Sequence, residues 1–303
     1  MTTIAAMIGA APVALSQAHA ACELLAELPQ AAAPGGQVAA AGMPERYAVS
    51  GGVAFVPVRG LLTPNSAAFE RWFGWSTYQG LTETAEALAA DQGVSAVVLD
   101  LDTPGGFVIG VDGAAEALAQ LAAVKPVHAL VSPLAASAGY WLASQATDVT
   151  MTPGAWVGSI GVAVLSSAYV GPGSGGAQYF QFTSSNARAK LPDPATEEGR
   201  AEIMRNLDAG EARFHAAVAR GRNIPVADLP GRLTATDDVR DGGAVWTGAE
   251  AISRGLADRV ATRAGFMAEI SQKYGRSGGT AGGRRASIAR QAQAEAARAL
   301  AAI

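Results

Sequence analysis

The sequence predicts an α/β fold in which helices flank a mostly parallel sheet. Short apolar runs that are typical of buried strands alternate along the chain with segments that have helical spacing of apolar residues. This alternation favours parallel strands that are joined by covering helices. The chain has 303 residues and is half apolar, so it is long enough to bury a core of this kind.

The first strands and helices are expected between residues 53 and 131. Val-rich and Leu-rich runs predict strands at 53–58, 94–101 and 126–131. Helical spacing predicts helices at 81–90 and 111–123.

The second half continues the alternation. We expect a helix over 137–145, a strand over 179–183, a long helix over 194–220 and a short helix followed by a strand within 245–260. Asp193 and further acidic residues stand at the start of the long helix, where the helix dipole favours negative charge.

Three parts are predicted along the chain. They are an N-terminal helical segment with a linker (1–45), a central domain (46–265), and a flexible linker followed by an Ala/Arg-rich helical tail (266–303). The N-terminal helix is expected over 12–28, and the Gly-rich stretch 277–283 separates the tail from the core.

Charge and cysteine content limit the possible functions. The net charge of −4 argues against a chain built to coat nucleic acid, because phosphate binding needs an excess of Lys and Arg. The single cysteine, Cys22, cannot form an internal disulfide, so the cytoplasm is a permitted location.

The first twenty residues partly match a secretory signal peptide. They are apolar and end in Ala18-His19-Ala20, but no Lys or Arg precedes them and Pro12 interrupts them. The apolar stretch is also too short to span a membrane. We therefore favour an intracellular helix without a transmembrane anchor.

Ser137 is the candidate nucleophile. It lies between a predicted strand and a predicted helix, where small neighbours leave its hydroxyl beside free backbone N–H groups. For an isolated serine the alternative role, a helix N-cap, would be the better interpretation. Gly105 and Gly106 follow the preceding strand and could present a backbone N–H to a ligand, although an ordinary Pro-Gly turn is the alternative. A Gly-Gly loop and a serine at neighbouring strand ends would place oxyanion donors and a hydroxyl at one edge of the sheet.

A serine nucleophile needs a base. His19, His128 and His215 have no convincing context, and each is better explained by a structural or solvated role. Lys190 is the remaining candidate, in the loop before the long helix. An exposed lysine is protonated at neutral pH, and burial in an apolar pocket is what lowers the pKa of a lysine enough for it to accept a proton.

Four segments in order resemble the signal peptide peptidase A family of serine-lysine peptidases. They are Thr-Pro-Gly-Gly at 103–106, Ser-Ala-Gly-Tyr at 137–140, Gly-Ser-Ile-Gly at 158–161 and Lys190. The resemblance extends over 47–260 and is strongest to the phage branch of capsid assembly (prohead) proteases.

The resemblance implies a role for each matched residue. Ser137 would be the nucleophile, Lys190 the base, and Ser159 the residue that orients the lysine, while the N–H groups of Gly106 and Ala138 would form the oxyanion hole. Many relatives have Gly where this chain has Ala138, a difference that leaves the backbone donor intact. The implied fold is the Clp-protease/crotonase type of α/β spiral, which usually forms rings or stacked oligomers, and the central domain would be the serine peptidase domain.

The phage branch implies scaffold or capsid proteins as substrates, no metal or other cofactor, and action in the host cytoplasm or inside the prohead. A cellular signal-peptide-degrading enzyme remains an alternative. So do an acyl-CoA enzyme of the crotonase type and a non-catalytic assembly or scaffold protein.

Overall fold

The structure is a computed structural model that describes residues 13–15, 45–166, 168, 171, 180 and 182–275. Within these residues the chain forms one nine-stranded sheet. Its strands are β1 (Val13–Leu15), β2 (Ala48–Ser50), β3 (Val53–Leu62), β4 (Ala96–Phe107), β5 (Val127–Ala136), β6 (Asp148–Met151), β7 (Trp156–Gly158), β8 (Val245–Thr247) and β9 (Arg259–Val260).

Parallel pairing dominates this sheet. The continuous path is β2-β3-β4-β5-β6-β9, with β1 paired to β4, β7 to β5, and β8 to β7. Only the β1–β4, β2–β3 and β7–β8 pairs of the described strands are antiparallel. The predicted α/β fold class, with a mostly parallel sheet flanked by helices, is confirmed.

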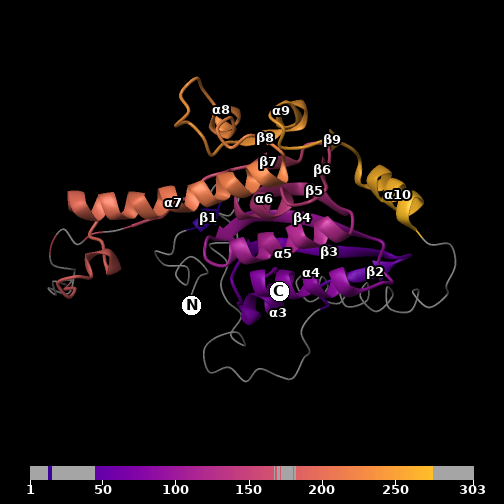
Figure 1. The fold of residues 1–303 in the computed structure, drawn as a ribbon, viewed down its shortest axis with the longest axis horizontal. Helices are drawn as coiled ribbons and strands as arrows, with labels where there is room; N and C mark the ends of the chain where they lie inside the picture. The colour runs from indigo at the N-terminus through magenta and orange to yellow at the C-terminus, as the bar shows by residue number, and fades with distance from the viewer. Residues whose placement is uncertain are drawn as a thin grey trace, which may run out of the picture.

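The helices cover both faces of the sheet (Figure 1). They are α3 (Ala67–Phe73), α4 (Tyr78–Ala90), α5 (Val111–Val124), α6 (Ala138–Ala143), η2 (Arg188–Lys190, a 3-10 turn), α7 (Glu197–Gly221), α8 (Leu229–Leu233), α9 (Gly248–Ser253) and α10 (Arg263–Tyr274). The large core packs α4, α5 and α6 against one face, and a smaller core packs α10 against the other.

Alternating side chains of the central strands separate these two cores. On β4, Val97, Leu99 and Leu101 belong to the large core, whereas Val98 packs with Phe266 of α10. Successive residues of a strand point to opposite faces, so an uninterrupted apolar run fills both sides. Each such side chain contributes roughly 1.5–3 kcal/mol when it is fully buried.

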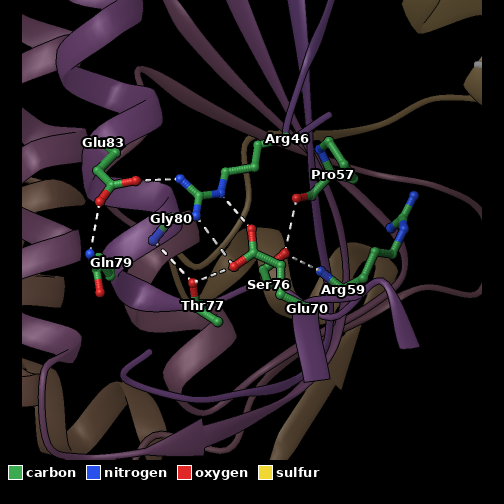
Figure 2. Close-up of polar contacts among 9 residues, drawn as sticks. All are labelled: Arg46, Pro57, Arg59, Glu70, Ser76, Thr77, Gln79, Gly80 and Glu83. Carbon is green, nitrogen blue, oxygen red and sulfur yellow. Dashed lines mark hydrogen bonds and ion pairs between the residues drawn. The ribbon is translucent and has the colours of Figure 1, made fainter. Parts of the chain in front are cut away.

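An arginine anchors the segment before β2 (Figure 2). The guanidinium of Arg46 donates to the carboxylates of Glu70 on α3 and Glu83 on α4. Glu70 is buried, and the hydroxyl of Thr77 also donates to it at 3.2 Å. These donors offset the cost of burying a carboxylate, so they fix the chain entry to α3 and α4.

The long helix α7 has two different halves. Near its C-terminal end Phe214 is buried and stacks on Trp141 of α6, with ring centroids 4.4 Å apart. Its N-terminal half projects past the sheet as an arm (Figure 1) and buries only Gly199. The turn η2, which carries Lys190, lies just before this arm in sequence.

Most predicted elements are confirmed, with shifted ends. The strands expected at 53–58, 94–101 and 126–131 are β3, β4 and β5, and the helices expected at 81–90 and 111–123 are α4 and α5. The helices expected at 137–145 and 194–220 are α6 and α7, and 245–260 contains β8, α9 and β9.

Four expectations about elements need correction. Residues 13–15, expected to begin a helix, form β1 because they pair with β4; the rest of that helix lies outside the described residues. The Pro-Gly turn that was the alternative for Gly105 and Gly106 is not formed, because these residues continue β4 and pair with β3. Residues 180, 182 and 183 are not in a strand, whereas 179 and 181 lie outside the described part.

The fourth correction concerns the end of the core. The boundary expected at 265 falls inside α10, whose Phe266 and Ile270 are buried against the sheet. The expected linker 277–283 and tail 284–303 lie outside the described residues.

Candidate active site

Ser137 lies at the junction between β5 and α6. Its backbone has φ 53° and ψ −122°, a conformation that few residues other than glycine adopt and that costs on the order of 1–3 kcal/mol. Its N–H donates to the carbonyl of Gly158 at 2.7 Å, which ties this turn to β7. Ser137 stands at the N-cap position of α6, but its side chain makes no capping hydrogen bond to that helix. A strained strand-to-helix turn is the type of position that presents a nucleophilic serine in other hydrolases.

Ser159 occupies a second strained turn in the same cavity. It also has φ 53°, and its N–H donates to the carbonyl of Ala244 at 2.7 Å. Ser137 and Ser159 both line a cavity of about 560 Å³, which is closed on other sides by residues of α7 and of the loop 239–243. The structure therefore brings two of the predicted site residues together.

The Thr-Pro-Gly-Gly segment is held by its threonine. The Thr103 hydroxyl donates to the carbonyl of Gly60 at 2.6 Å and accepts from the N–H of Gly105 at 3.1 Å. Gly105 has φ 108°, which favours glycine. A Cβ on Gly106 would lie 2.0 Å from the carbonyl oxygen of Leu62, so only glycine fits there.

The Ser-Ala-Gly-Tyr segment packs directly on this threonine. A Cβ on Gly139 would lie 2.4 Å from Cγ2 of Thr103, so glycine permits α6 to approach β4 this closely. Tyr140 is buried and its hydroxyl donates to the carbonyl of Leu256 at 2.8 Å, which pins α6 to the chain that follows α9. Ala138 is the first residue of α6, and an N–H at that position has no acceptor within its own helix.

Lys190 is not brought to this cavity. It is exposed on η2, and the described residues that line the cavity of Ser137 do not include it. Its backbone N–H donates to the carbonyl of Ala187 at 3.0 Å, which closes the short turn.

Two titratable residues of α7 line the cavity, and the sequence did not place either of them there. His215 and Glu211 lie one turn apart on α7, and both line the cavity. Burial lowers the pKa of His215, an effect that the charge of Glu211 opposes. Their spacing of four residues places them on one face of a helix, which the sequence alone indicates. The spacing does not show that this face lines a cavity, because that depends on how α7 packs near Ser137.

The other histidines lie elsewhere. The Nδ1 of His128 is 2.5 Å from the Asp148 carboxylate, and its Nε2 is 3.1 Å from the Tyr274 hydroxyl. These contacts join β5, β6 and α10 and give His128 a structural role. His19 and Cys22 lie outside the described residues.

Two searches of the described part found nothing. It contains no cluster of three or more His, Cys, Asp or Glu side chains that could hold a metal ion. None of its helices is both long and apolar enough to span a bilayer.

The fold and the strained serine define a hydrolase-like α/β domain. The sequence profile of peptidase family S49 matches residues 119–275, which is more than half of the chain. The chain therefore belongs to peptidase family S49, and the family expected from the motifs is confirmed.

Curated relatives agree with this assignment. Capsid assembly protease C of Escherichia phage lambda is 31% identical over 226 residues, which cover 71% of this chain and 47% of the relative. Head-tail preconnector protein GP5 of Enterobacteria phage P21 is 29% identical over 71% of this chain and 42% of the relative. Protease 4 of Haemophilus influenzae is 25% identical over 71% of this chain and 34% of the relative. The chain thus spans half or less of the length of these relatives.

Solved structures give weaker likenesses. An enoyl-CoA hydratase/isomerase family protein from Silicibacter pomeroyi is 15% identical over 76% of this chain and 80% of its own, with a TM-score of 0.42. A membrane-bound stomatin-specific protease in complex with a substrate peptide is 20% identical over 72% of this chain and 79% of its own, with a TM-score of 0.38. Scores of this size carry no argument about function.

Proposed function

We propose that the chain is a serine endopeptidase in which Ser137 attacks the peptide carbonyl and Lys190 accepts its proton. The observation that carries this proposal is the strained turn of Ser137, whose side chain caps no helix and lines a cavity next to Ser159. Membership of a peptidase family supports it.

The proposed reaction has two halves. The Ser137 Oγ bonds to the carbonyl carbon as its proton moves to the neutral amine of Lys190, and the N–H groups of Gly106 and Ala138 stabilise the oxyanion. Collapse breaks the C–N bond, and the leaving amine takes the proton from Lys190. Water then repeats the attack on the acyl-serine ester, with Lys190 again as base, and releases the acid product and free Ser137. Ser159 acts as a positioning residue for the lysine.

We further propose that the chain works as a homo-oligomer in which Lys190 reaches Ser137 of a second copy. Two observations support a neighbour at the arm. Lys190 is exposed and away from the cavity lining. The apolar side chains of Leu191, next to it in sequence, and of Met204 on the arm are each at least half exposed, and exposed apolar side chains of this kind are available for a protein contact.

Mixing two inactive variants tests this arrangement. Ser137→Ala keeps the lysine and Lys190→Ala keeps the serine, so copies that share sites regain active pairs. Random mixing of equal amounts should restore about a quarter of the wild-type cleavage of an unfolded protein such as casein. A mixture that forms mixed oligomers yet stays inactive would contradict the shared site, while the dyad itself would still be judged by the single variants.

We propose capsid or scaffold proteins as the substrates, cleaved in the host cytoplasm or inside the prohead. The names of the two phage relatives support this choice over a cellular role, which remains the alternative because of the match to Protease 4. Where a major capsid gene lies beside this gene, co-expression with its product should give a truncated capsid protein with wild type and none with Ser137→Ala. Finding no capsid gene nearby, and cleavage of isolated signal peptides instead, would favour the cellular role.

A further inference from the structure

At the end of β4, β3 pairs with only one of the two strand edges. β3 pairs with β4 as far as Leu62 opposite Gly106. β5 holds the other edge only up to Thr103, which is paired with Ala135. A strand has two edges, so any partner of Gly105 beyond that point must lie on the side of β5.

β1 pairs with this second edge of β4. It runs antiparallel to the end of β4, with Val13 opposite Phe107, Ala14 opposite Gly106 and Leu15 opposite Gly105. Gly105 is two residues past Thr103, and Ser137 is two residues past Ala135, the partner of Thr103. The backbone of β1 therefore lies on the side of Ser137 and at the level of Ser137 along the sheet.

An extended peptide that pairs with an exposed strand edge gains its affinity from main-chain hydrogen bonds. A peptidase substrate must be extended in this way beside the nucleophile, with its carbonyl at the oxyanion donors. Gly106, a proposed donor, is the residue of β4 that is paired with Ala14 of β1. We infer that the edge Gly105–Phe107 is a peptide-binding site and that residues 13–15 of this chain are its internal ligand, which competes with substrate. This inference rests on the proposed function for what is being competed with.

We expect the release of β1 to change KM only moderately. A strand of three residues forms few backbone bonds and is a weak ligand, but its tether gives it an effective concentration on the order of millimolar. A tethered competitor raises the apparent KM and leaves kcat unchanged. Loss of the competitor should lower KM roughly two- to tenfold.

Proline substitutions in β1 provide the test. In an antiparallel pair, alternate residues hydrogen-bond to the partner strand. The bonding N–H groups of β1 are therefore either that of Ala14, which Ala14→Pro removes, or those of Val13 and Leu15, which the double variant Val13→Pro/Leu15→Pro removes. The variant that spares the bonding positions serves as the matched control. Each is made in the full chain with Ser137→Ala, and amide hydrogen exchange is measured over residues 103–110.

We expect one of the two variants to speed exchange by tenfold or more at whichever of the Gly106 and Phe107 amides donates to β1, whereas the Gly105 N–H, which donates to the Thr103 hydroxyl, should be little changed. Unchanged exchange in both would overturn the inference, whatever the chain's activity. In chains that retain Ser137, the same variant should lower KM for a reporter peptide at unchanged kcat. A synthetic peptide of residues 11–18 should then inhibit it competitively, and no inhibition together with an unchanged KM would also overturn the inference. A complete lack of cleavage would contradict the proposed function, yet the exchange result would still decide whether β1 occupies this edge.

Discussion

The nucleophile and its proposed base lie in very different surroundings. Ser137 is 1% exposed, at the end of a central strand, and its backbone is fixed by Gly158. Lys190 is exposed on a three-residue turn before a projecting helix. One copy of the chain therefore brings Ser137 and Ser159 to one cavity, whereas Lys190 lies outside the lining of that cavity. In the proposed mechanism the serine is thus positioned by a single copy, and the lysine must be brought to it by a further contact.

We expect the largest loss of activity when either Ser137 or Lys190 is replaced. Ser137→Ala and Lys190→Ala should each lower kcat/KM by at least about 10³-fold, and Lys190→Arg should not rescue, because a guanidinium does not give up its proton. Residues that act as a unit are not additive, so the double variant should be no worse than either single one. Steady-state cleavage of a reporter peptide measures this, with melting temperature as the control for folding. Additive losses would mean that the two residues act separately.

The proposed oxyanion hole can be weakened without replacing Ser137 or Lys190. Gly106→Ala places a methyl group against the Leu62 carbonyl, so the backbone must shift and misplace its N–H. We expect a loss of about 10²–10³-fold in kcat. Gly113→Ala is the matched control, because its Cβ on α5 meets nothing within 4 Å and should stabilise the helix by roughly 0.5–1 kcal/mol. Equal activity of the two variants would argue against Gly106 as a donor.

Ser159→Ala should have a smaller effect. If Ser159 only orients the lysine, its loss should lower kcat about tenfold, leave KM unchanged and shift the pH profile of kcat. Ser159→Thr, which keeps the hydroxyl, should recover part of the activity. A pH profile identical to wild type would leave Ser159 a purely structural residue.

The smallest effect concerns acid stability away from the site. Burial raises the pKa of Asp258, but the hydrogen bonds from Arg222 and from the Val149 N–H outweigh this, and the net pKa is lowered. A carboxylate with a lowered folded-state pKa contributes stability above its unfolded pKa of about 3.9, and this contribution is lost as the pH falls through the folded value. Asp258→Asn should therefore lower the melting temperature by a few degrees at neutral pH and by less near pH 3. An equal decrease at both pH values would contradict the ionic role.

Sequence alone identified the strands that carry the site but not how the site is completed. The apolar runs ending at Leu101 and Val131 are β4 and β5, since a buried parallel strand leaves an unmistakable pattern. Pairing over a long sequence distance leaves no such pattern. That is why the sequence predicts a helix at Val13–Leu15, and why it predicts only a structural or solvated role for His215, which lines the cavity of Ser137 through the packing of α7. The residues around Lys190 in the sequence also do not indicate whether its side chain is exposed or buried.

The rate at which Ser137 is acylated tests the central claim most directly. A fluorophosphonate probe reacts with an activated serine, and intact-mass measurement with peptide mapping gives both the site and the rate. Wild type should be labelled at Ser137, Lys190→Ala should react at least about 10²-fold more slowly, and His215→Gln should react at a rate close to wild type. Labelling of Lys190→Ala at the wild-type rate, or loss of labelling in His215→Gln alone, would contradict lysine as the base.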